Sequence, residues 1–282
     1  MELQLIRPLV QAALAEDLAW GDLTTDNLID PAQTCEWVLL LKQEGVVAGL
    51  PLAKEVFAQL EPNLLWTPFH QDGEFLPPGT VLARVQGRAQ PLLKAERVAL
   101  NFLQRLSGIA SLTRRFVVEA HKGNPQVRVV DTRKTTPGLR YLEKYAVRKG
   151  GGHNHRFCLS DAVMIKDNHL ALVEQSGRSL VAAVQEMRQR LGHLVKVEIE
   201  VDRLDQIPPA LEAGADCILL DNMTPDQLRQ AVTLIGNRAL TEASGGVRLE
   251  TIQAIAASGV AVISVGALTH SPPALDISLD AP

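Results

Sequence analysis

Hydrophobic positions in the first hundred residues change from helical to strand-like spacing and back again. Apolar residues recur every three to four positions from Leu3 to Leu18, which predicts an amphipathic helix that the turn-rich stretch 21–25 ends. The following pattern predicts strands at 37–42, 64–70 and 81–85, and helices at 51–60 and 91–106. These elements together predict an α+β module of about 100 residues.

From about Gly108 onward, short aliphatic runs alternate with helical patterns, which is typical of parallel βα units. We interpret six runs as strands: 127–131, 163–166, 195–201, 216–221, 239–242 and 260–265. The repeated unit favours an α/β barrel, and an incomplete one, because the full fold has eight strands. A doubly wound open sheet is the alternative.

Polar residues and glycines stand at or just beyond the carboxyl ends of these predicted strands. They are Asp131, Lys166, Glu200, Asp221, Ser244 with Gly245, and Gly266. Barrel active sites are built on this face, where the strands hold such groups rigidly around one mouth. The pattern therefore predicts an active site at the strand ends.

Basic residues are concentrated in one segment of an otherwise acidic chain. Residues 131–166 carry eight Lys or Arg against three acidic residues, while the whole chain has a net charge of -4. Duplex binding needs a broad positive surface, so this island favours a small anionic ligand and argues against nucleic acid. The helical residues Lys144, Arg148 and Lys149 also fit an ordinary solvated face. Arg133, Lys134 and the glycine run 150–152 adjoin breaks in regular structure, where a backbone can approach a ligand closely.

Composition limits the class of protein. With 46% hydrophobic but only 4% aromatic residues, the core must be aliphatic, as in barrel strands. Cys35, Cys158 and Cys217 form no CxxC pair, so we expect reduced thiols, no thiolate metal site and a cytoplasmic protein. We expect neither a signal peptide nor a membrane anchor, because no apolar run reaches about 18 residues.

The strand-end residues allow more than one chemistry. Glu200 and Asp221 suit ribose hydroxyls and a hydrated Mg²⁺, although either acid also suits a cap on the following helix. Backbone N–H groups at Ser244, Gly245 and Gly266 suit a phosphate, with His270 as a further donor. Lys166 suits an anionic carboxylate or, as an aldolase-like alternative, a Schiff base that requires a neutral, desolvated amine.

Several segments resemble, in order and spacing, the quinolinate phosphoribosyltransferase family, the carboxylating nicotinate-nucleotide pyrophosphorylases. The central signature consists of DTRKTTPGLR, GGGHNHR and MIKDNH, and the resemblance covers nearly the whole chain. The other segments are EDLAWGDLTT, AERVALNFLQRLSGIASLT, VEIEVD, ILLDN, EASGG and SVGALTHS.

The resemblance implies a fold and a set of site residues. The implied fold is an N-terminal α/β sandwich domain, 1–107 joined by 271–282, followed by an incomplete, roughly seven-stranded α/β barrel, 108–270. The quinolinate contacts it implies are Arg133, His155, Arg156 and Lys166, with Arg97 reaching in from a neighbouring subunit. The phosphoribosyl diphosphate contacts it implies are Lys134, Glu200, Asp221, Ser244, Gly245, Gly266 and His270. Of these, Lys134, Glu200 and Asp221 are the expected catalytic residues, and Glu200 and Asp221 hold Mg²⁺ through water.

The implied reaction joins quinolinate to 5-phosphoribosyl 1-diphosphate with decarboxylation, giving nicotinate mononucleotide for NAD biosynthesis. Several cations suit two adjacent carboxylates, which are costly to desolvate unpaired. A nicotinate phosphoribosyltransferase, which meets one carboxylate, is the near alternative, and a non-enzymatic phosphosugar-binding barrel is the distant one. The resemblance also implies a homodimer with shared active sites, which can assemble further to a hexamer.

Overall fold

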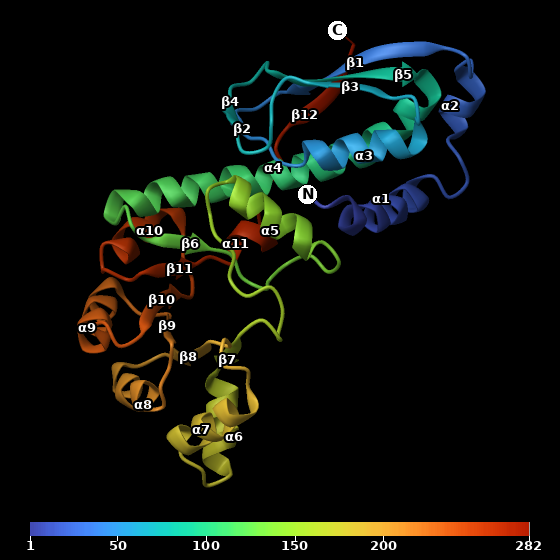
Figure 1. The fold of residues 1–282 in the computed structure, drawn as a ribbon. Helices are drawn as coiled ribbons and strands as arrows, with labels where there is room; N and C mark the ends of the chain where they lie inside the picture. Colours follow the sequence, from blue (N-terminus) through green and yellow to red (C-terminus); the bar gives the residue numbers. More distant parts are fainter. Residues whose placement is uncertain (282) are drawn as a thin grey trace. The chain divides into compact units, whose positions relative to one another are not determined.

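The computed structural model describes residues 1–281, and the chain divides into two compact units. The N-terminal unit contains residues 1–114, 136–151 and Leu268 onward, and the barrel unit contains residues 115–135 and 152–267. Figure 1 labels the helices and strands of both units. Each unit has a main β-sheet of its own.

The N-terminal unit is built on an antiparallel sheet in the order β12-β1-β5-β3. Its strands are β1 (Thr34–Leu41), β3 (Leu65–Pro68), β5 (Val81–Arg88) and β12 (Ile277–Asp280), and β2 (Gly45–Val46) pairs separately with β4 (Phe75–Leu76). Its helices are α1 (Leu3–Asp17), α2 (Leu23–Leu28), α3 (Leu50–Leu60), α5 (Arg140–Lys149), most of α4 (Ala89–Gly123) and the end of α11 (Ala267–His270). The strands and helices predicted in this part of the chain are therefore present. The C-terminal strand β12 completes the sheet by pairing antiparallel with β1, where Leu39 lies opposite Leu279.

Helix α4 is much longer than the predicted helix 91–106, and it begins in the N-terminal unit and ends in the barrel unit. The predicted change of pattern at Gly108 does not end it. A Cβ on Gly108 would lie 2.0 Å from the Pro273 carbonyl oxygen, so this glycine allows a distant segment to cross the helix closely. Gly150 serves the same purpose, since its Cβ would lie 2.3 Å from the Ala110 carbonyl oxygen of α4. This packing gives a structural reason for glycine at 150, beside the predicted approach of the backbone to a ligand.

The barrel unit consists of parallel strands alternating with helices. Its strands are β6 (Arg128–Val130), β7 (Val163–Ile165), β8 (Val197–Val201), β9 (Cys217–Asp221), β10 (Leu240–Ser244) and β11 (Val262–Ser264). The connecting helices are α6 (Asp167–Gln175), α7 (Leu180–Arg190), α8 (Ile207–Glu212), α9 (Pro225–Ile235) and α10 (Leu249–Ala256). All six predicted strands are confirmed.

The sheet order β6-β11-β10-β9-β8-β7 identifies a barrel rather than a doubly wound sheet. From β7 to β11 each new strand is added on the same side of the preceding one, and β6 then closes on β11, whereas a doubly wound sheet reverses direction at a switch point. An isolated parallel bridge between Val130 and His153 extends the pairing beyond β6. The incomplete α/β barrel is confirmed, with six strands and this bridge among residues 1–281.

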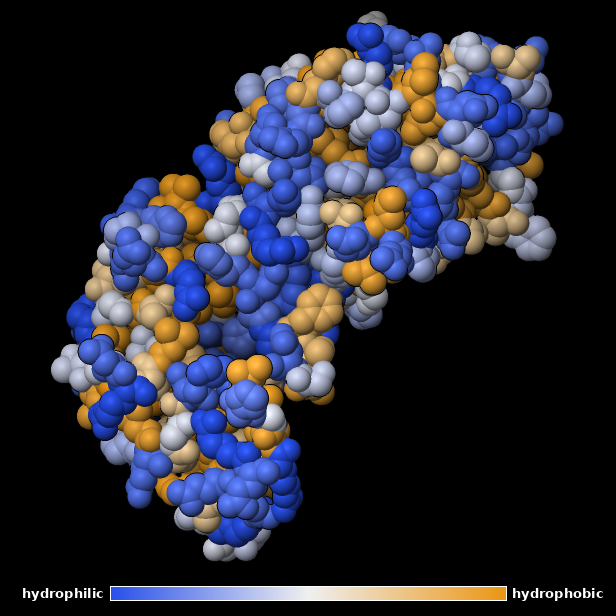
Figure 2. Space-filling model, viewed as in Figure 1, coloured by the Kyte–Doolittle hydropathy of each residue, from blue (hydrophilic) through white to orange (hydrophobic). Residues whose placement is uncertain are grey.

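The barrel core is aliphatic, as the scarcity of aromatic residues predicted. Its strands bury Val129, Ile199, Ile218 and Ile263, each at most 1% exposed. On the face drawn in Figure 2, hydrophobic residues are interspersed among hydrophilic ones. Over the described part of the chain, no helix combines the length and apolar character needed to cross a membrane.

Candidate active site

The carboxyl ends of the barrel strands bring most of the predicted site residues to one edge of the sheet. Asp131 follows β6, Lys166 follows β7, Glu200 is the penultimate residue of β8, and Asp221 and Ser244 end β9 and β10. Parallel pairing of β8 with β9 and of β9 with β10 puts these ends side by side. The predicted placement at strand ends is thus confirmed.

Two guanidinium groups of the predicted quinolinate site influence each other in the barrel unit. Burial and the nearby charge of Arg133 both lower the pKa of Arg156 below the usual guanidinium range. Arg156 Nη1 donates to the Ala162 carbonyl oxygen at 2.8 Å, but Arg133 Nε is buried and has no hydrogen-bond partner among the described residues. Two neighbouring cations with an unused buried donor require a nearby anion.

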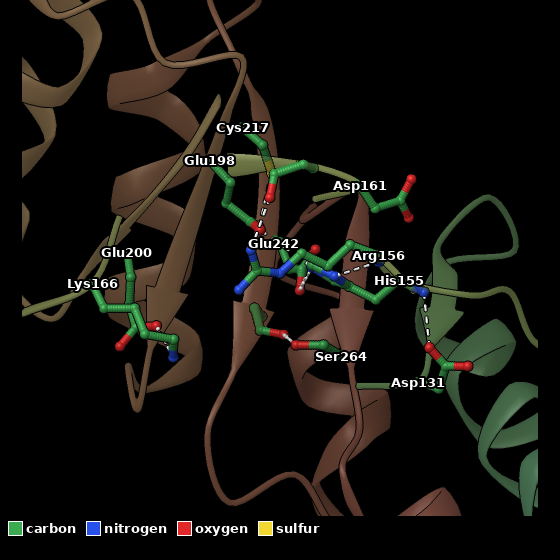
Figure 3. Close-up of polar contacts among 12 residues, drawn as sticks. Asp131, His155, Arg156, Asp161, Lys166, Glu198, Glu200, Cys217, Glu242 and Ser264 are labelled. Carbon is green, nitrogen blue, oxygen red and sulfur yellow. Dashed lines mark hydrogen bonds and ion pairs between the residues drawn. The ribbon is translucent and has the colours of Figure 1, made fainter. Parts of the chain in front are cut away.

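Asp131 fixes the loop that carries His155 and Arg156. Its side chain is fully buried, and its Oδ2 accepts from Asn154 Nδ2 at 2.6 Å while its Oδ1 accepts the His155 backbone N–H at 2.9 Å. The Asp131 backbone N–H in turn donates to the His153 carbonyl oxygen at 3.1 Å. A short strand end therefore holds a loop that lacks regular structure of its own, as Figure 3 shows for Asp131 and His155.

Lys166 forms an ion pair with Glu200, with Nζ 2.9 Å from Oε2. This contact joins a predicted quinolinate residue to a predicted phosphoribosyl diphosphate residue, so the two predicted subsites adjoin (Figure 3). The Lys166 side chain is 46% exposed and paired with a carboxylate, whereas a Schiff base requires a desolvated, neutral amine. These surroundings argue against the Schiff-base alternative.

Neither Glu200 nor Asp221 caps the following helix. Thr224 is the N-cap of α9 and accepts from the Gln227 backbone N–H, and the short helix after β8 begins only at Leu204. Asp221 Oδ2 instead accepts from Asn222 Nδ2 at 2.6 Å. Both carboxylates therefore remain at the strand ends as candidates for ribose and metal.

The turn after β10 packs tightly on the turn after β9. Asn222 has a positive φ of 54°, and its N–H donates to the Ser244 carbonyl oxygen at 2.9 Å. A Cβ on Gly245, at φ +90°, would lie 2.2 Å from Asn222 Oδ1 and 2.8 Å from the Asn222 backbone nitrogen. This position requires glycine for both conformation and space.

A buried group behind these residues was not predicted from the sequence. His155 Nε2 lies 3.2 Å from Glu198 Oε2 and 3.4 Å from Glu242 Oε1, and Cys217 Sγ donates to Glu198 Oε1 at 3.4 Å. Burial raises the pKa of Cys217 first, and the nearby carboxylates add to the effect, so its thiol stays protonated. Carboxylates within buried strands are the sequence signal for this group, because charge there needs a partner.

The four remaining predicted residues are divided between the two units. Lys134 is exposed in the barrel unit, and its backbone N–H donates to Thr132 Oγ1 at 3.0 Å. Arg97 on α4 and His270 at the end of α11 are exposed and belong to the N-terminal unit. Gly266 lies just beyond β11 in the barrel unit.

The metal prediction concerns Glu200 and Asp221. Among residues 1–281, the group of three ligand side chains close enough to share an ion is His155, Glu198 and Glu242, which does not include them. Two carboxylates on adjacent strands nevertheless fit Mg²⁺, which binds through one or two carboxylates and keeps water and phosphate oxygens as its other ligands. The residues present are compatible with the metal.

Comparison with known proteins agrees with the fold and the strand-end motifs. Residues 22–107 match the family description "Quinolinate phosphoribosyl transferase, N-terminal domain", and residues 109–280 match the corresponding C-terminal domain. The "Probable nicotinate-nucleotide pyrophosphorylase [carboxylating]" of Bacillus subtilis (strain 168) is 45% identical over 98% of this chain and 93% of its own length. The "Quinolinate phosphoribosyltransferase [decarboxylating] 2, mitochondrial" of Nicotiana glauca is 40% identical over 97% of this chain and 81% of its own.

A solved structure is similar over the same length. The crystal structure of NadC from Streptococcus pyogenes matches with a TM-score of 0.94 and 41% identity, covering 100% of this chain and 97% of the other. Sequence and fold lead to one assignment. The chain belongs to the quinolinate phosphoribosyltransferase family.

Proposed function

We propose that this chain transfers the phosphoribosyl group of 5-phosphoribosyl 1-diphosphate to quinolinate and releases CO₂, forming nicotinate mononucleotide and diphosphate. The observation that carries the proposal is the pair Arg133 and Arg156, two neighbouring guanidiniums of which one has a buried, unpartnered Nε. A substrate with two adjacent carboxylates supplies the charge that this pair lacks. Nicotinate has one carboxylate and suits the site less well.

The chain's own residues perform three tasks in this reaction. Arg133, Arg156 and Lys166 bind the two carboxylates of quinolinate and orient its ring nitrogen toward the anomeric carbon. Glu200 and Asp221 contact the ribose and stabilise the positive charge that develops there as diphosphate leaves. Lys134, the Ser244 and Gly245 backbone, Gly266 and His270 bind the phosphate groups.

The proposed reaction needs no covalent intermediate with the enzyme, because each bond that forms is matched by one that breaks. The pyridine nitrogen forms the bond to the anomeric carbon while the bond from that carbon to diphosphate oxygen breaks. The bond from ring carbon 2 to its carboxyl group then breaks, and the electron pair stays at carbon 2 beside the positive nitrogen until a proton replaces CO₂. The contact between Lys166 and Glu200 supports the first step, because bond formation requires adjoining subsites.

Glu200 and Asp221 would hold Mg²⁺, largely through water. When bound, the ion neutralises charge on the diphosphate leaving group. Its remaining ligands would come from water and from the diphosphate itself.

We further propose a homodimer in which Arg97 completes the partner's quinolinate site, and a cytoplasmic location in keeping with three free cysteines. Apolar side chains around α2 support association, since Trp20, Leu23 and Leu28 are 97%, 83% and 75% exposed. Such side chains are typical of a surface that a second copy covers.

The test of the reaction is release of ¹⁴CO₂ from quinolinate labelled at the 2-carboxyl group. We expect release that depends on phosphoribosyl diphosphate and Mg²⁺ and that is lost in Arg133→Ala. Formation of nicotinate mononucleotide from nicotinate, without release of CO₂ from quinolinate, would instead establish the alternative phosphoribosyltransferase.

A further inference from the structure

The two buried glutamates behind the site have no task in the proposed reaction. Glu198 and Glu242 are 7% and 3% exposed, and Glu242 Oε1 accepts no hydrogen bond within residues 1–281. Burying a carboxylate without full hydrogen bonding is costly, so this pair needs a reason. Figure 3 shows both side chains directed at the segment that carries His155 and Arg156.

The hydrogen bonds of His155 decide what its ring can do. The Arg156 backbone N–H donates to His155 Nδ1 at 2.7 Å. Because a peptide N–H can only donate, Nδ1 must accept, and the ring proton is on Nε2. Nε2 then donates to Glu198 Oε2 at 3.2 Å, and the Glu242 carboxylate lies beside it at 3.4 Å. Both ring nitrogens are thus used within the protein.

Two influences on His155 oppose each other. Burial lowers the pKa of His155, but the nearby carboxylates of Glu198 and Glu242 outweigh burial and raise it. A second proton would have to enter at Nδ1, where it would meet the Arg156 N–H. We give priority to the hydrogen bond, because one nitrogen cannot both carry a proton and accept another.

The same tautomer argues against a metal site. His155, Glu198 and Glu242 lie within 4.8 Å of one another and have suitable ligand atoms. A histidine that binds a metal through Nε2 carries its proton on Nδ1, which the Arg156 N–H opposes. The group therefore acts through its contacts with the protein.

Glu198 also acts on Arg156 directly. Burial and the charge of Arg133 lower the pKa of Arg156, and the charge of Glu198 opposes them. A carboxylate behind two neighbouring guanidiniums reduces their mutual repulsion, which otherwise drives them apart. Glu198 therefore supports the dicarboxylate site through its charge as well as through His155.

We propose that Glu198 and Glu242 are positioning residues of the dicarboxylate site. They hold the His155 ring, its Nδ1 fixes the Arg156 backbone, and His155 thus serves quinolinate through Arg156 rather than as a cation of its own. The inference rests on the proposed function and replaces the expected direct contact of His155 with quinolinate.

Two substitutions at His155 distinguish positioning from direct binding. In His155→Asn, Oδ1 takes the place of Nδ1 and still accepts the Arg156 N–H, whereas His155→Phe keeps a ring without an acceptor. We expect His155→Phe to weaken quinolinate binding about tenfold more than His155→Asn in calorimetry. Equal losses in the two variants would show that the ring binds quinolinate itself and would overturn the proposal.

Substitution of the acids supplies a second test. We expect Glu198→Gln to raise the dissociation constant for quinolinate about tenfold and that for phosphoribosyl diphosphate less than about threefold. Glu212→Gln, an exposed residue of α8, is the matched control. Equal weakening of both ligands, or of neither, would contradict a role at the dicarboxylate site.

The wild-type protein supplies a measurement that no folding defect can obscure. In ¹⁵N-histidine spectra at neutral pH we expect His155 as the Nε2–H tautomer, before and after addition of quinolinate. A ring protonated at Nδ1 would overturn the proposal. If the wild type neither binds quinolinate nor releases CO₂, the proposed function fails; if it does both but the variants behave alike, only the positioning role fails.

Discussion

At the scale of single residues, the site is defined by charge that the protein leaves incompletely compensated. Arg133 Nε is buried without a partner, and Arg156 lies close enough for the charge of Arg133 to lower its pKa. A protein tolerates such an arrangement when a ligand supplies the missing charge.

The first prediction concerns these two arginines. Removing one partner of a buried charge pair costs about 3–5 kcal/mol, so Arg133→Ala or Arg156→Ala should weaken quinolinate binding at least about a hundredfold. Phosphoribosyl diphosphate binding should change far less. Calorimetry with each ligand separately measures both effects, and equal losses would remove these residues from the dicarboxylate site.

The second prediction compares two neighbouring glycines. Gly245→Ala would place a methyl group against the Asn222 backbone at φ +90°, whereas Gly246, at φ +56°, has no atom within 4 Å of an added Cβ. We expect Gly245→Ala to lower turnover at least about tenfold, because the shifted turn moves Asn222 and Asp221. Gly246→Ala should cost only about 1–2 kcal/mol of stability from its left-handed backbone. Similar turnover in the two variants would show that the contact with Asn222 is unimportant.

Residue positions were predictable where residue type and strand position agreed. Lys166, Glu200 and Asp221 stand at strand ends, and their types suggest charge-based catalysis. Glu198 was not predicted as a site residue. Alternation in β8 places it on the same face as Glu200, but only the folded structure shows that its partner is His155. The need for glycine at position 108 could not be predicted either, because it arises from the close approach of Pro273.

At the scale of elements, the starts of β8 and β9 are held by Asp216. Its side chain accepts from the Val197 backbone N–H, Arg188 and Lys196, each at 2.9 Å. Burial raises the pKa of Asp216, but these hydrogen bonds outweigh burial and lower it below the ordinary 3.8. A lowered carboxyl pKa stabilises the fold in full above the ordinary value and loses its effect as the pH falls through the folded value.

The third prediction follows from the lowered pKa of Asp216. Asp216→Asn should lower the free energy of unfolding by about 1–3 kcal/mol at neutral pH, and the difference from the wild type should shrink below pH 3.8. Asp205→Asn, which removes an exposed partner of Arg203, should change stability by less than about 1 kcal/mol. Denaturant unfolding at several pH values measures both, and a loss for Asp216→Asn that is independent of pH would exclude the charge as its cause.

The fourth prediction concerns the ends of β8 and β9. Glu200→Gln and Asp221→Asn should lower turnover more than they raise the Michaelis constant for quinolinate, because their charge matters most when the ribose becomes positive. Steady-state kinetics gives both parameters. Turnover within about threefold of the wild type in both variants would limit their contribution to about 1 kcal/mol.

Element types were predictable and element lengths were less so. The spacing of apolar residues and the runs of β-branched residues identified the six barrel strands, because parallel buried strands carry a strong hydrophobic signal. The length of α4 was missed because the glycine at 108 resembles a helix end, while its role is to allow close packing. The pairing of β12 with β1 depends on residues at opposite ends of the sequence, so no local pattern predicts it.

At the scale of the whole molecule, the fifth prediction tests the proposed shared site. Arg97 lies exposed on α4, in a different unit from Arg133 and Arg156. If Arg97 acts in the partner's site, mixing inactive Arg97→Ala with inactive Lys166→Ala should restore activity. A mixed dimer collects both defects in one site and leaves the other intact, so about a quarter of wild-type activity should return when half of the dimers are mixed.

Subunit exchange must be shown independently, for example with subunits that carry different affinity tags. Each variant incubated alone is the control. If Arg97 serves its own chain, every site keeps a defect, and exchange without recovery would refute the shared site.

The pairing of β12 with β1 has a consequence for biosynthesis. During translation β1 emerges early, but the strand that covers its edge follows the entire barrel. Until then the nascent N-terminal sheet has an unpaired edge, which is a template for pairing with other chains. The barrel has no such dependence on the last strand and can fold first. A ribosome stalled near the end of the message would therefore present a finished barrel joined to a sheet that is prone to aggregation, and chaperone binding should be strongest in this interval.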